Sequence, residues 1–365
     1  MTTNLGYSLQ FRSFENSGKM RPIQKRCVII SMLGIISCIV IMTLKAQGIL
    51  FPSQWYLEER NFNPLELYDL KIEYLIENST KISSIEENIH AFKSDLPKMN
   101  MNLSNEITVL TAYFNIGSFA KGVFRRQYTP NIYYKWMSVF RNMTNNVIFY
   151  TNDMIAYKYF QKLRENLPKV RTKIFLINKK ELWSFKIHDI ISQIYTQPDY
   201  PKHLPNTVVP GYSCAMHAKF ELLNRVIRKN YFHTKYFMWL DIGLFRYLHD
   251  DPKFKLAKPT DFDDTKVAYS QVEYFQEDIT YKDIIYDNMV WIGGASNLGK
   301  YDVLYKFTQE YLNFVNKSLS IKLISTDQQI IYGMYVDKHK PETKLQLYKS
   351  GWFKLGYVCY AAGKN

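Results

Sequence analysis

The chain has 365 residues, of which 47% are hydrophobic and 22% are charged. This length and apolar content allow one large or two small globular units and exclude a chain that is disordered throughout. The formal net charge of +14 suits an anionic membrane or phosphorylated small molecules, although a lysine-rich solvated surface is the simpler explanation of it. The basic residues are scattered, without zinc-finger or recognition-helix spacing, so we expect no nucleic-acid partner.

An uncharged apolar stretch occupies residues 27–44, CVIISMLGIISCIVIMTL. At about 1.5 Å per residue it nearly crosses a hydrocarbon core of roughly 30 Å, and its flanks complete the span. Basic residues outnumber acidic ones before it, which favours a cytoplasmic N-terminus. We therefore predict a cytoplasmic tail at 1–26 and a single transmembrane anchor at 27–45. The alternative is a cleaved signal peptide, against which the length of the run argues.

Glycosylation sequons follow the apolar stretch, which agrees with a lumenal C-terminal part. They lie at Asn78, Asn102, Asn142 and Asn316. Two cysteines, Cys214 and Cys359, also follow the anchor. In an oxidising compartment these residues form either one disulfide or two buried free thiols.

Residues 46–105 are mixed in character and weakly periodic, which is typical of a stem between a membrane and a head domain. From residue 106 on, short apolar runs with polar ends alternate with stretches of helical spacing. We predict strands at ITVLTAYF, NVIFYTND, TKIFLIN, KYFMWLDIG, VAYSQVEYF, NMVWIGGASNLG and KLQLYKSGWFKLGYVCY. We predict helices after Pro130, over IAYKYFQKLRENL, over SCAMHAKFELLNRVIRKN with Ser213 as the N-cap, and over KYDVLYKFTQEYLNFVNKSL. The segment STDQQIIYGMYVDK is predicted to be a helix or the edge between a strand and a helix.

This alternation predicts an α/β sandwich with a mainly parallel sheet. In such sheets ligands bind beyond the carboxyl ends of the strands. Tyr113, Asn115, residues 151–153 and Asp241 all fall at such ends, so we expect them to share one rim. The 29 Tyr and 23 Phe residues further indicate strands or an aromatic-lined cleft.

Asp241 directly follows the apolar run YFMWL. A carboxylate at the end of a buried strand is desolvated unless backbone donors or a cation face it. Mn²⁺ or Mg²⁺ binds one or two carboxylates together with substrate phosphates, which is what transfer from a nucleotide-sugar requires. The alternative is an ordinary turn, because D-x-G is common turn chemistry.

Three further segments add polar groups to the expected rim. Lys219, on the preceding helix, is placed to contact a phosphate, or else is a surface lysine. Gly293 and Gly294 allow a close approach of the backbone to a ligand, or mark a hairpin bulge. Asp327 in STDQQ can accept hydrogen bonds from a sugar or act as a base, although Ser-Thr-Asp is also a good N-cap cluster.

The order of these segments resembles that of glycosyltransferases of the GT-A fold, with TAYFNIG, HAKFELL, WLDIG, WIGGASN and STDQQ in succession. More closely, the stretch from Ile107 to Tyr332 resembles the HtrL/YibB family of bacterial and nematode proteins placed near those transferases, and the anchor suggests a nematode-type member. The resemblance implies a GT-A-like (Rossmann-related) α/β/α sandwich at residues 106–365 and glycosyl transfer as the activity.

One departure from that pattern concerns the metal. The GT-A motif has two carboxylates, D-x-D, whereas this chain has Asp241-Ile242-Gly243. Gly243 offers no side-chain ligand. A metal is then bound by Asp241, the phosphates and a remote ligand such as Asp337 or His339, or no metal is bound. A lone exposed histidine such as His339 is more often a solvated side chain than a metal ligand.

Two functions are consistent with these residues. The first is a type II membrane glycosyltransferase of the Golgi or endoplasmic reticulum, which transfers a sugar from a nucleotide-sugar donor to a glycan or protein acceptor. The expected contacts are the metal or donor ribose for Asp241, the diphosphate for Lys219, the nucleobase or ribose for Tyr113 and Asn115, and the transferred sugar or acceptor for Asp327 and Gln328. The second is a GT-A-like protein that has lost catalysis and binds a glycan or a partner, which the missing second carboxylate favours.

Overall fold

The computed structural model describes residue 96, residues 102–248 and residues 252–364. The predicted tail and transmembrane anchor, and nearly all of the predicted stem, lie outside the described residues. Among the helices of the described part, none is long and apolar enough to cross a membrane.

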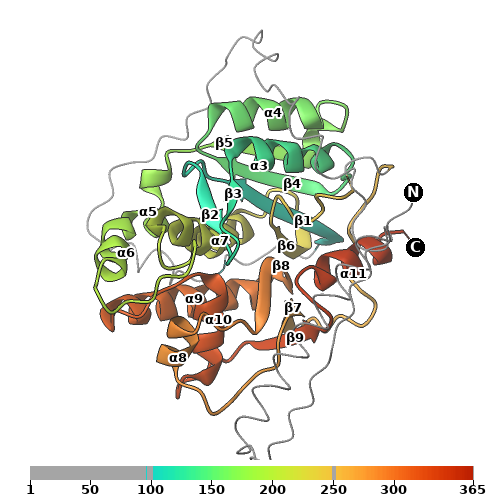
Figure 1. The fold of residues 1–365 in the computed structure, drawn as a ribbon. Helices are drawn as coiled ribbons and strands as arrows, with labels where there is room; N and C mark the ends of the chain where they lie inside the picture. The colour runs from blue at the N-terminus through green and yellow to red at the C-terminus, as the bar shows by residue number, and fades with distance from the viewer. Residues whose placement is uncertain (1–95, 97–101, 249–251, 365) are drawn as a thin grey trace, which may run out of the picture. The chain divides into compact units, whose positions relative to one another are not determined.

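The described residues form strands and helices in alternation (Figure 1). The strands are β1 (Ser104–Tyr113), β2 (Phe119–Lys121), β3 (Arg126–Tyr128), β4 (Asn146–Thr151), β5 (Thr172–Leu176), β6 (Thr234–Leu240), β7 (Lys266–Gln271), β8 (Ile292–Lys300) and β9 (Lys344–Tyr348). The α-helices are α3 (Pro130–Met137), α4 (Met154–Arg164), α5 (Trp183–Lys186), α6 (His188–Tyr195), α7 (Pro210–Lys229), α8 (Tyr281–Tyr286), α9 (Tyr301–Ser320), α10 (Asp327–Val336) and α11 (Lys354–Ala362). Short 3-10 turns lie at Ser138–Arg141, Lys169–Arg171 and Lys179–Glu181.

Seven of these strands form one sheet in the order β5-β4-β1-β6-β8-β7-β9. The pairs β4–β5, β1–β4, β1–β6 and β7–β9 are parallel, whereas β8 is antiparallel to both β6 and β7. Six strands therefore run in one direction and β8 runs in the other. The mainly parallel α/β sheet predicted from the sequence is confirmed.

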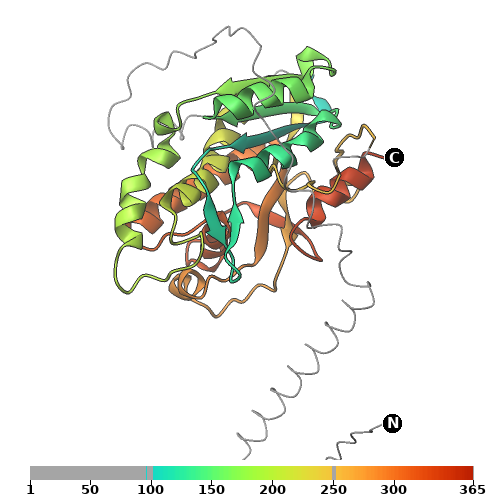
Figure 2. The ribbon, with the colours of Figure 1, turned by 45° about the horizontal axis from the view of Figure 1, so that its top comes forward.

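The sheet is buried on both faces because its strands are continuous apolar runs whose side chains alternate between faces. In β6, Phe237 and Trp239 pack into one core cluster, while Met238 and Leu240 pack into the other. Helices α5, α6, α7, α9 and α10 contribute to the first cluster, and α3, α4 and α11 contribute to the second. Figure 2 shows helices on both sides of the sheet. The molecule thus has helical layers on either face of a central sheet.

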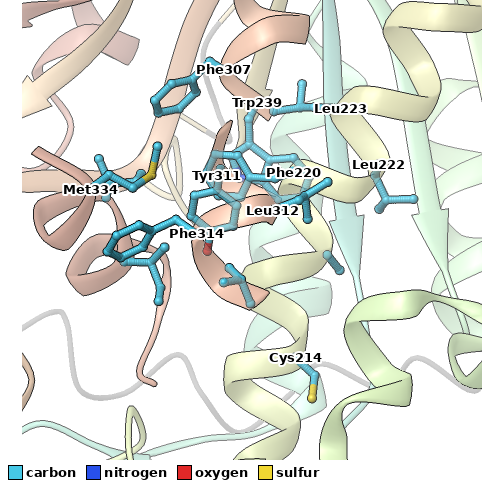
Figure 3. Close-up of a cluster of buried hydrophobic side chains, with 14 of the residues drawn as sticks. Cys214, Phe220, Leu222, Leu223, Trp239, Phe307, Tyr311, Leu312, Phe314 and Met334 are labelled. Atoms are coloured by element: carbon cyan, nitrogen blue, oxygen red, sulfur yellow. The ribbon is translucent and has the colours of Figure 1, made fainter. Parts of the chain in front are cut away.

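Helices α7 and α9 pack together over the first face of the sheet (Figure 3). The rings of Phe220 and Tyr311 stack at 3.6 Å between centroids, and Trp239 of β6 joins the same cluster. The hydroxyl group of Tyr311 is also 2.8 Å from Nδ1 of the fully buried His217. This packing fixes the rotation of α7 and therefore the direction in which its polar residues point.

Two predicted elements differ from the structure. Helix α7 begins at Pro210, three residues before Ser213, because a proline is favoured in the first turn of a helix. Ser213 lies inside the helix and its hydroxyl donates a hydrogen bond to the backbone oxygen of Asn206. The last predicted strand is β9 followed by helix α11, so its aromatic C-terminal half is helical.

The two cysteines of the described part are both free and buried. Cys214 on α7 belongs to the core cluster on one face of the sheet, and Cys359 on α11 belongs to the cluster on the other face. A disulfide needs Cα atoms about 4.4–6.8 Å apart, which the intervening sheet prevents. Of the two alternatives, the structure has the free thiols.

Candidate functional site

A pocket of about 490 Å³ lies at the edge of the sheet where β1 and β6 end. Its walls come from the end of β1, the β2–β3 hairpin, α3, the first half of α7, the residues after β6, the start of β8, the start of α10 and the loop before α11. Segments that are far apart in the sequence therefore surround one space.

The reversed direction of β8 brings its first residues to this edge. Leu240 at the end of β6 pairs with Ser296, and the backbone N–H of Asp241 donates a 2.8 Å hydrogen bond to the carbonyl of Ala295. Gly294 therefore lies beside Asp241 in the pocket lining. Both glycines stand within the first residues of β8, inside the strand predicted over NMVWIGGASNLG.

Lys219 is the centre of the polar cluster in the pocket. Its Nζ atom lies 3.1 Å from Oδ1 of Asp241 and 3.0 Å from Oδ2 of Asp327, and it donates a 2.9 Å hydrogen bond to the carbonyl of Gly294. The side chains of Lys219 and Asp327 are 2% and 4% exposed, whereas that of Asp241 is 36% exposed. One buried ammonium group thus joins two carboxylates, of which one faces the open pocket.

Burial and charge act in opposite directions on this cluster. Desolvation lowers the pKa of Lys219, but Asp241 and Asp327 outweigh it, so the net shift is upward and the lysine stays charged. Desolvation raises the pKa of Asp327, and the repulsion of Asp241 adds to this, while Lys219 opposes both. A carboxylate with a raised pKa is suited to accept a proton.

Trp239 holds Asp241 in place. Its indole Nε1–H donates a 2.6 Å hydrogen bond to Oδ1 of Asp241, the same oxygen that faces Lys219. The ammonium group of Lys219 also lies 5.6 Å from the centroid of the Trp239 ring. Lys219 and the indole N–H of Trp239 thus compensate the carboxylate of Asp241 at the end of this buried strand.

Two glycines leave room for this arrangement. A Cβ atom on Gly294 would lie 2.3 Å from Oδ2 of Asp327, so the absence of a side chain allows the carboxylate to approach β8. A Cβ atom on Gly243 would lie 2.6 Å from Cε3 of Trp136. The position where the D-x-D motif has its second carboxylate is thus closed by an aromatic ring.

The residues of the pocket do not suit the divalent cation that the GT-A resemblance implies. A hard cation needs several oxygen ligands, and Oδ1 of Asp241 and Oδ2 of Asp327 face the ammonium group of Lys219. In residues 96, 102–248 and 252–364, no group of three or more His, Cys, Asp or Glu residues is placed to hold a metal. Asp337 and His339 follow the far end of α10, about 15 Å from Asp327 at 1.5 Å per residue.

Aromatic side chains form one wall of the pocket. They are Phe119, Tyr128, Tyr133, Trp136 and Tyr212. Phe119 and Tyr128 of the β2–β3 hairpin stack with ring centroids 5.7 Å apart, and Phe119 also contacts Tyr212 of α7. The rings pack mainly against one another, which gives this side of the pocket a fixed apolar surface.

The whole pocket lies inside a region that matches a known family. A family model described as "Bacterial protein of unknown function (HtrL_YibB)" matches residues 105–362, about 70% of the chain. The chain belongs to the HtrL_YibB family. No curated protein matches it. This match confirms the family predicted from the sequence. The description of the HtrL_YibB family names no activity.

The structure brings most of the predicted site residues together in this HtrL_YibB chain. Lys219, Asp241, Gly294 and Asp327 form the polar cluster, and Tyr113 and Gln328 also line the pocket. The residue Tyr113 is buried and packs against Tyr134, with ring centroids 5.8 Å apart. The amide of Gln328 is 3.4 Å from the carbonyl of Ile292.

Two predicted site residues are not among those that line the pocket. Asn115 donates a 2.7 Å hydrogen bond to Asp153, the carboxylate that caps the N-terminus of α4. It therefore holds the loop after β1 to that helix. A Cβ atom on Gly293 would lie 2.8 Å from the backbone oxygen of Trp352, so this glycine allows a close approach of the chain to itself.

The aromatic content indicated strands or an aromatic-lined cleft, but sequence reasoning did not identify the residues of the aromatic wall, and it missed two cations of the pocket, Lys121 and Arg246. Tyr212 could have been predicted from the sequence, because it precedes Lys219 by seven positions and so lies on the same face of α7. Lys121 carried no such pattern, since its place depends on a hairpin that folds back over α7 and positions its Nζ atom 3.0 Å from the hydroxyl of Tyr212.

Proposed function

We propose that the chain is a type II membrane glycosyltransferase with a GT-A-like domain at residues 106–365, which transfers a sugar from a nucleotide-sugar donor to a glycan or protein acceptor. The observation that supports this most is the convergence of Lys219, Asp241, Gly294 and Asp327 on one pocket. These residues come from α7, the end of β6, the start of β8 and the start of α10. Their meeting point is the strand-end edge at which α/β sheets bind ligands.

The volume and chemistry of the pocket are compatible with such a donor. About 490 Å³ falls within the roughly 300–1,000 Å³ of small-molecule sites, and the site combines aromatic walls with a few polar groups. In this proposal the partly exposed carboxylate of Asp241 contacts the donor ribose. Asp327 and Gln328 contact the transferred sugar or the acceptor hydroxyl group, and the raised pKa of Asp327 suits removal of the acceptor proton.

A binding protein without catalysis is the second candidate, and one observation favours it. Asp327 is nearly buried and bound to Lys219, so a base in this position must first exchange its partner to reach a substrate. Such a protein would hold a nucleotide or glycan in the same pocket without turnover. The two candidates therefore differ in reaction and not in the place of binding.

Nucleotide binding and turnover separate these possibilities. The purified full chain in detergent is titrated with UDP and GDP, each with and without Mn²⁺, by calorimetry. We expect binding of at least one nucleotide, and an absence of binding in every condition would refute the transferase. Release of free nucleotide from UDP-sugars or GDP-sugars is then measured. Turnover that Asp241→Ala and Asp327→Ala each abolish supports the enzyme, whereas binding without turnover supports the binding protein.

The membrane topology is a separate part of the proposal. It rests on the apolar stretch at residues 27–44 and on the sequons that follow it, with the Golgi or endoplasmic reticulum as the compartment. In intact microsomes we expect the C-terminal part to resist added protease and to become sensitive when detergent opens the vesicles. Digestion in intact vesicles would contradict a lumenal domain.

A further inference from the structure

The charges that line the pocket do not balance. Its lining contains the cations Lys121, Lys219 and Arg246 against the carboxylates Asp241 and Asp327, which leaves an excess of one positive charge (3 − 2 = +1). Lys219 contacts both carboxylates, and Lys121 and Arg246 are the other cations of the lining. A pocket with this arrangement suits an anionic group on its hairpin side.

Lys121 comes from the β2–β3 hairpin and lines the same pocket as the acidic cluster. Its Nζ atom donates a 3.0 Å hydrogen bond to the hydroxyl of Tyr212, and within the described residues no carboxylate lies within 4.0 Å of it. Desolvation in the pocket lowers the pKa of this lysine, and the charges of Asp241 and Asp327 offset this only in part. An anion beside it would restore the stability of the charged form.

Arg246 provides a second cation at the same side. Its guanidinium carbon lies 4.8 Å from the centroid of the Trp136 ring and 5.0 Å from that of Phe353. Stacking of this kind fixes the plane of a guanidinium group, which binds phosphate oxygens through two parallel N–H bonds. Trp136 is also the ring that closes the position beside Gly243, so the same side chain positions a cation and excludes a second acid.

The acidic cluster already contains its own cation. Lys219 is buried, bridges Asp241 and Asp327, and is held by the carbonyl of Gly294. A divalent ion bound at these carboxylates would lie next to this ammonium group, and the repulsion between like charges is strong in a buried site. The lysine thus stands where a metal would otherwise neutralise the acids.

We propose that the pocket binds the diphosphate of a nucleotide without a divalent cation, with Lys219 neutralising Asp241 and Asp327 while Lys121 and Arg246 contact the phosphate oxygens. This inference rests on the proposed function, because it assumes a nucleotide-sugar donor, and it adds the mode in which the anion is held. It also explains how an Asp-x-Gly sequence can serve in place of D-x-D.

The decisive experiment compares affinities with and without metal. The full chain in detergent is titrated with UDP and GDP in EDTA and again in Mn²⁺. We expect a Kd in EDTA within about threefold of that in Mn²⁺, a difference below about 0.7 kcal/mol. Binding that requires Mn²⁺ would overturn this inference and leave the proposed function intact. No binding in either buffer would overturn the proposed function itself.

Substitution of Lys121 tests the anion contact. Loss of one charge-assisted hydrogen bond should weaken nucleotide binding by about tenfold or more in Lys121→Met, and Lys121→Arg should recover most of the affinity. Lys173→Met is the matched control, because Lys173 is exposed on β5 and outside the pocket lining. An unchanged Kd in Lys121→Met, with an unchanged thermal transition as evidence of folding, would overturn the assignment of Lys121.

Discussion

The ammonium nitrogen of Lys219 lies 3.0 Å from Oδ2 of Asp327, and both side chains are almost completely removed from water. This ion pair connects the middle of α7 to the first residue of α10 across the start of β8. The desolvation of both charges offsets their attraction, so a buried pair of this kind adds little net stability. Its main effect is to favour one arrangement of the two helices. Its partners nevertheless depend strongly on each other.

Removal of the lysine should therefore be more damaging than its net contribution suggests. In Lys219→Met, Asp327 is left buried without its cation, and we expect the free energy of unfolding to fall by about 3 kcal/mol. Guanidinium unfolding of the full chain in detergent, followed by tryptophan fluorescence, measures this change. Lys229→Met is the control on the same helix, because Lys229 is exposed. A loss below about 1 kcal/mol would contradict the assignment of Lys219 as the buried partner.

The Lys219→Met variant also allows a test with Mn²⁺, in which the change in Tm is measured. If Lys219 takes the place of a cation, its removal leaves Asp241 and Asp327 able to bind one. Addition of Mn²⁺ should then raise the Tm of Lys219→Met clearly more than that of the unmodified chain. Equal shifts in the two proteins would count against a cationic role of this lysine.

Gly294 should not tolerate a methyl group. In Gly294→Ala the new Cβ atom would lie 2.3 Å from Oδ2 of Asp327 and would displace that carboxylate from Lys219. We expect a loss of about 1–3 kcal/mol in unfolding free energy together with loss of nucleotide binding. Gly211→Ala is the matched control, because its nearest neighbour would be a side-chain carbon of Ile116 at an ordinary 3.6 Å. Equal behaviour of the two variants would rule out the steric explanation.

His217 should make stability depend on pH. Burial lowers its pKa from 6.5 to about 3, so the folded chain keeps it neutral while the unfolded chain takes up a proton below pH 6.5. The unfolded state then binds more protons between these values, and stability falls as the pH drops from 6.5 toward 3. In His217→Gln the slope below pH 6 should be smaller by up to about 1.4 kcal/mol per pH unit. Unfolding curves at several pH values measure both slopes, and identical slopes would contradict this prediction.

Cys214 and Cys359 should remain unlinked even in an oxidising compartment, because they belong to core clusters on opposite faces of the sheet. After unfolding without a reductant, iodoacetamide should alkylate both, and mass spectrometry of the tryptic peptides should detect each modified peptide. A sample reduced beforehand serves as the control and should give the same peptides. A peptide pair linked through these cysteines would refute the prediction.

Much of the fold was accessible from the sequence because its strands are short apolar runs that end in polar residues. Six of the seven predicted strands are confirmed as β1, β4, β5, β6, β7 and β8, and the first part of the seventh is β9. The exception is the C-terminal run around Tyr357 and Cys359, whose aromatic and β-branched residues are typical of a strand. Here tertiary contacts decide, since α11 packs on β7 and β8 and the carbonyl of Cys359 accepts a hydrogen bond from Ala257.

The site was predictable only in part, for a related reason. Asp241 stands at the end of a strong strand pattern, so the strand-end rule placed it at this edge, and Lys219 and Asp327 were expected to add polar groups to the same rim. That Gly294 joins them depends on the reversed direction of β8, which no local pattern encodes. Lys121 depends on how a three-residue hairpin strand packs against Tyr212, and such long-range packing lies beyond propensity and periodicity.

The contact between Gly294 and Asp327 has a consequence for the evolution of the family. Because a side chain at position 294 would occupy the space of the carboxylate at position 327, the two positions cannot change independently. An HtrL_YibB homologue that carries alanine or a larger residue at 294 should have lost the acid at 327 and should no longer need the lysine at 219. Loss of this polar cluster in such a lineage would then appear as correlated replacements at three positions that are far apart in the sequence. A glycine retained at 294 would mark the members in which the acid is still in use.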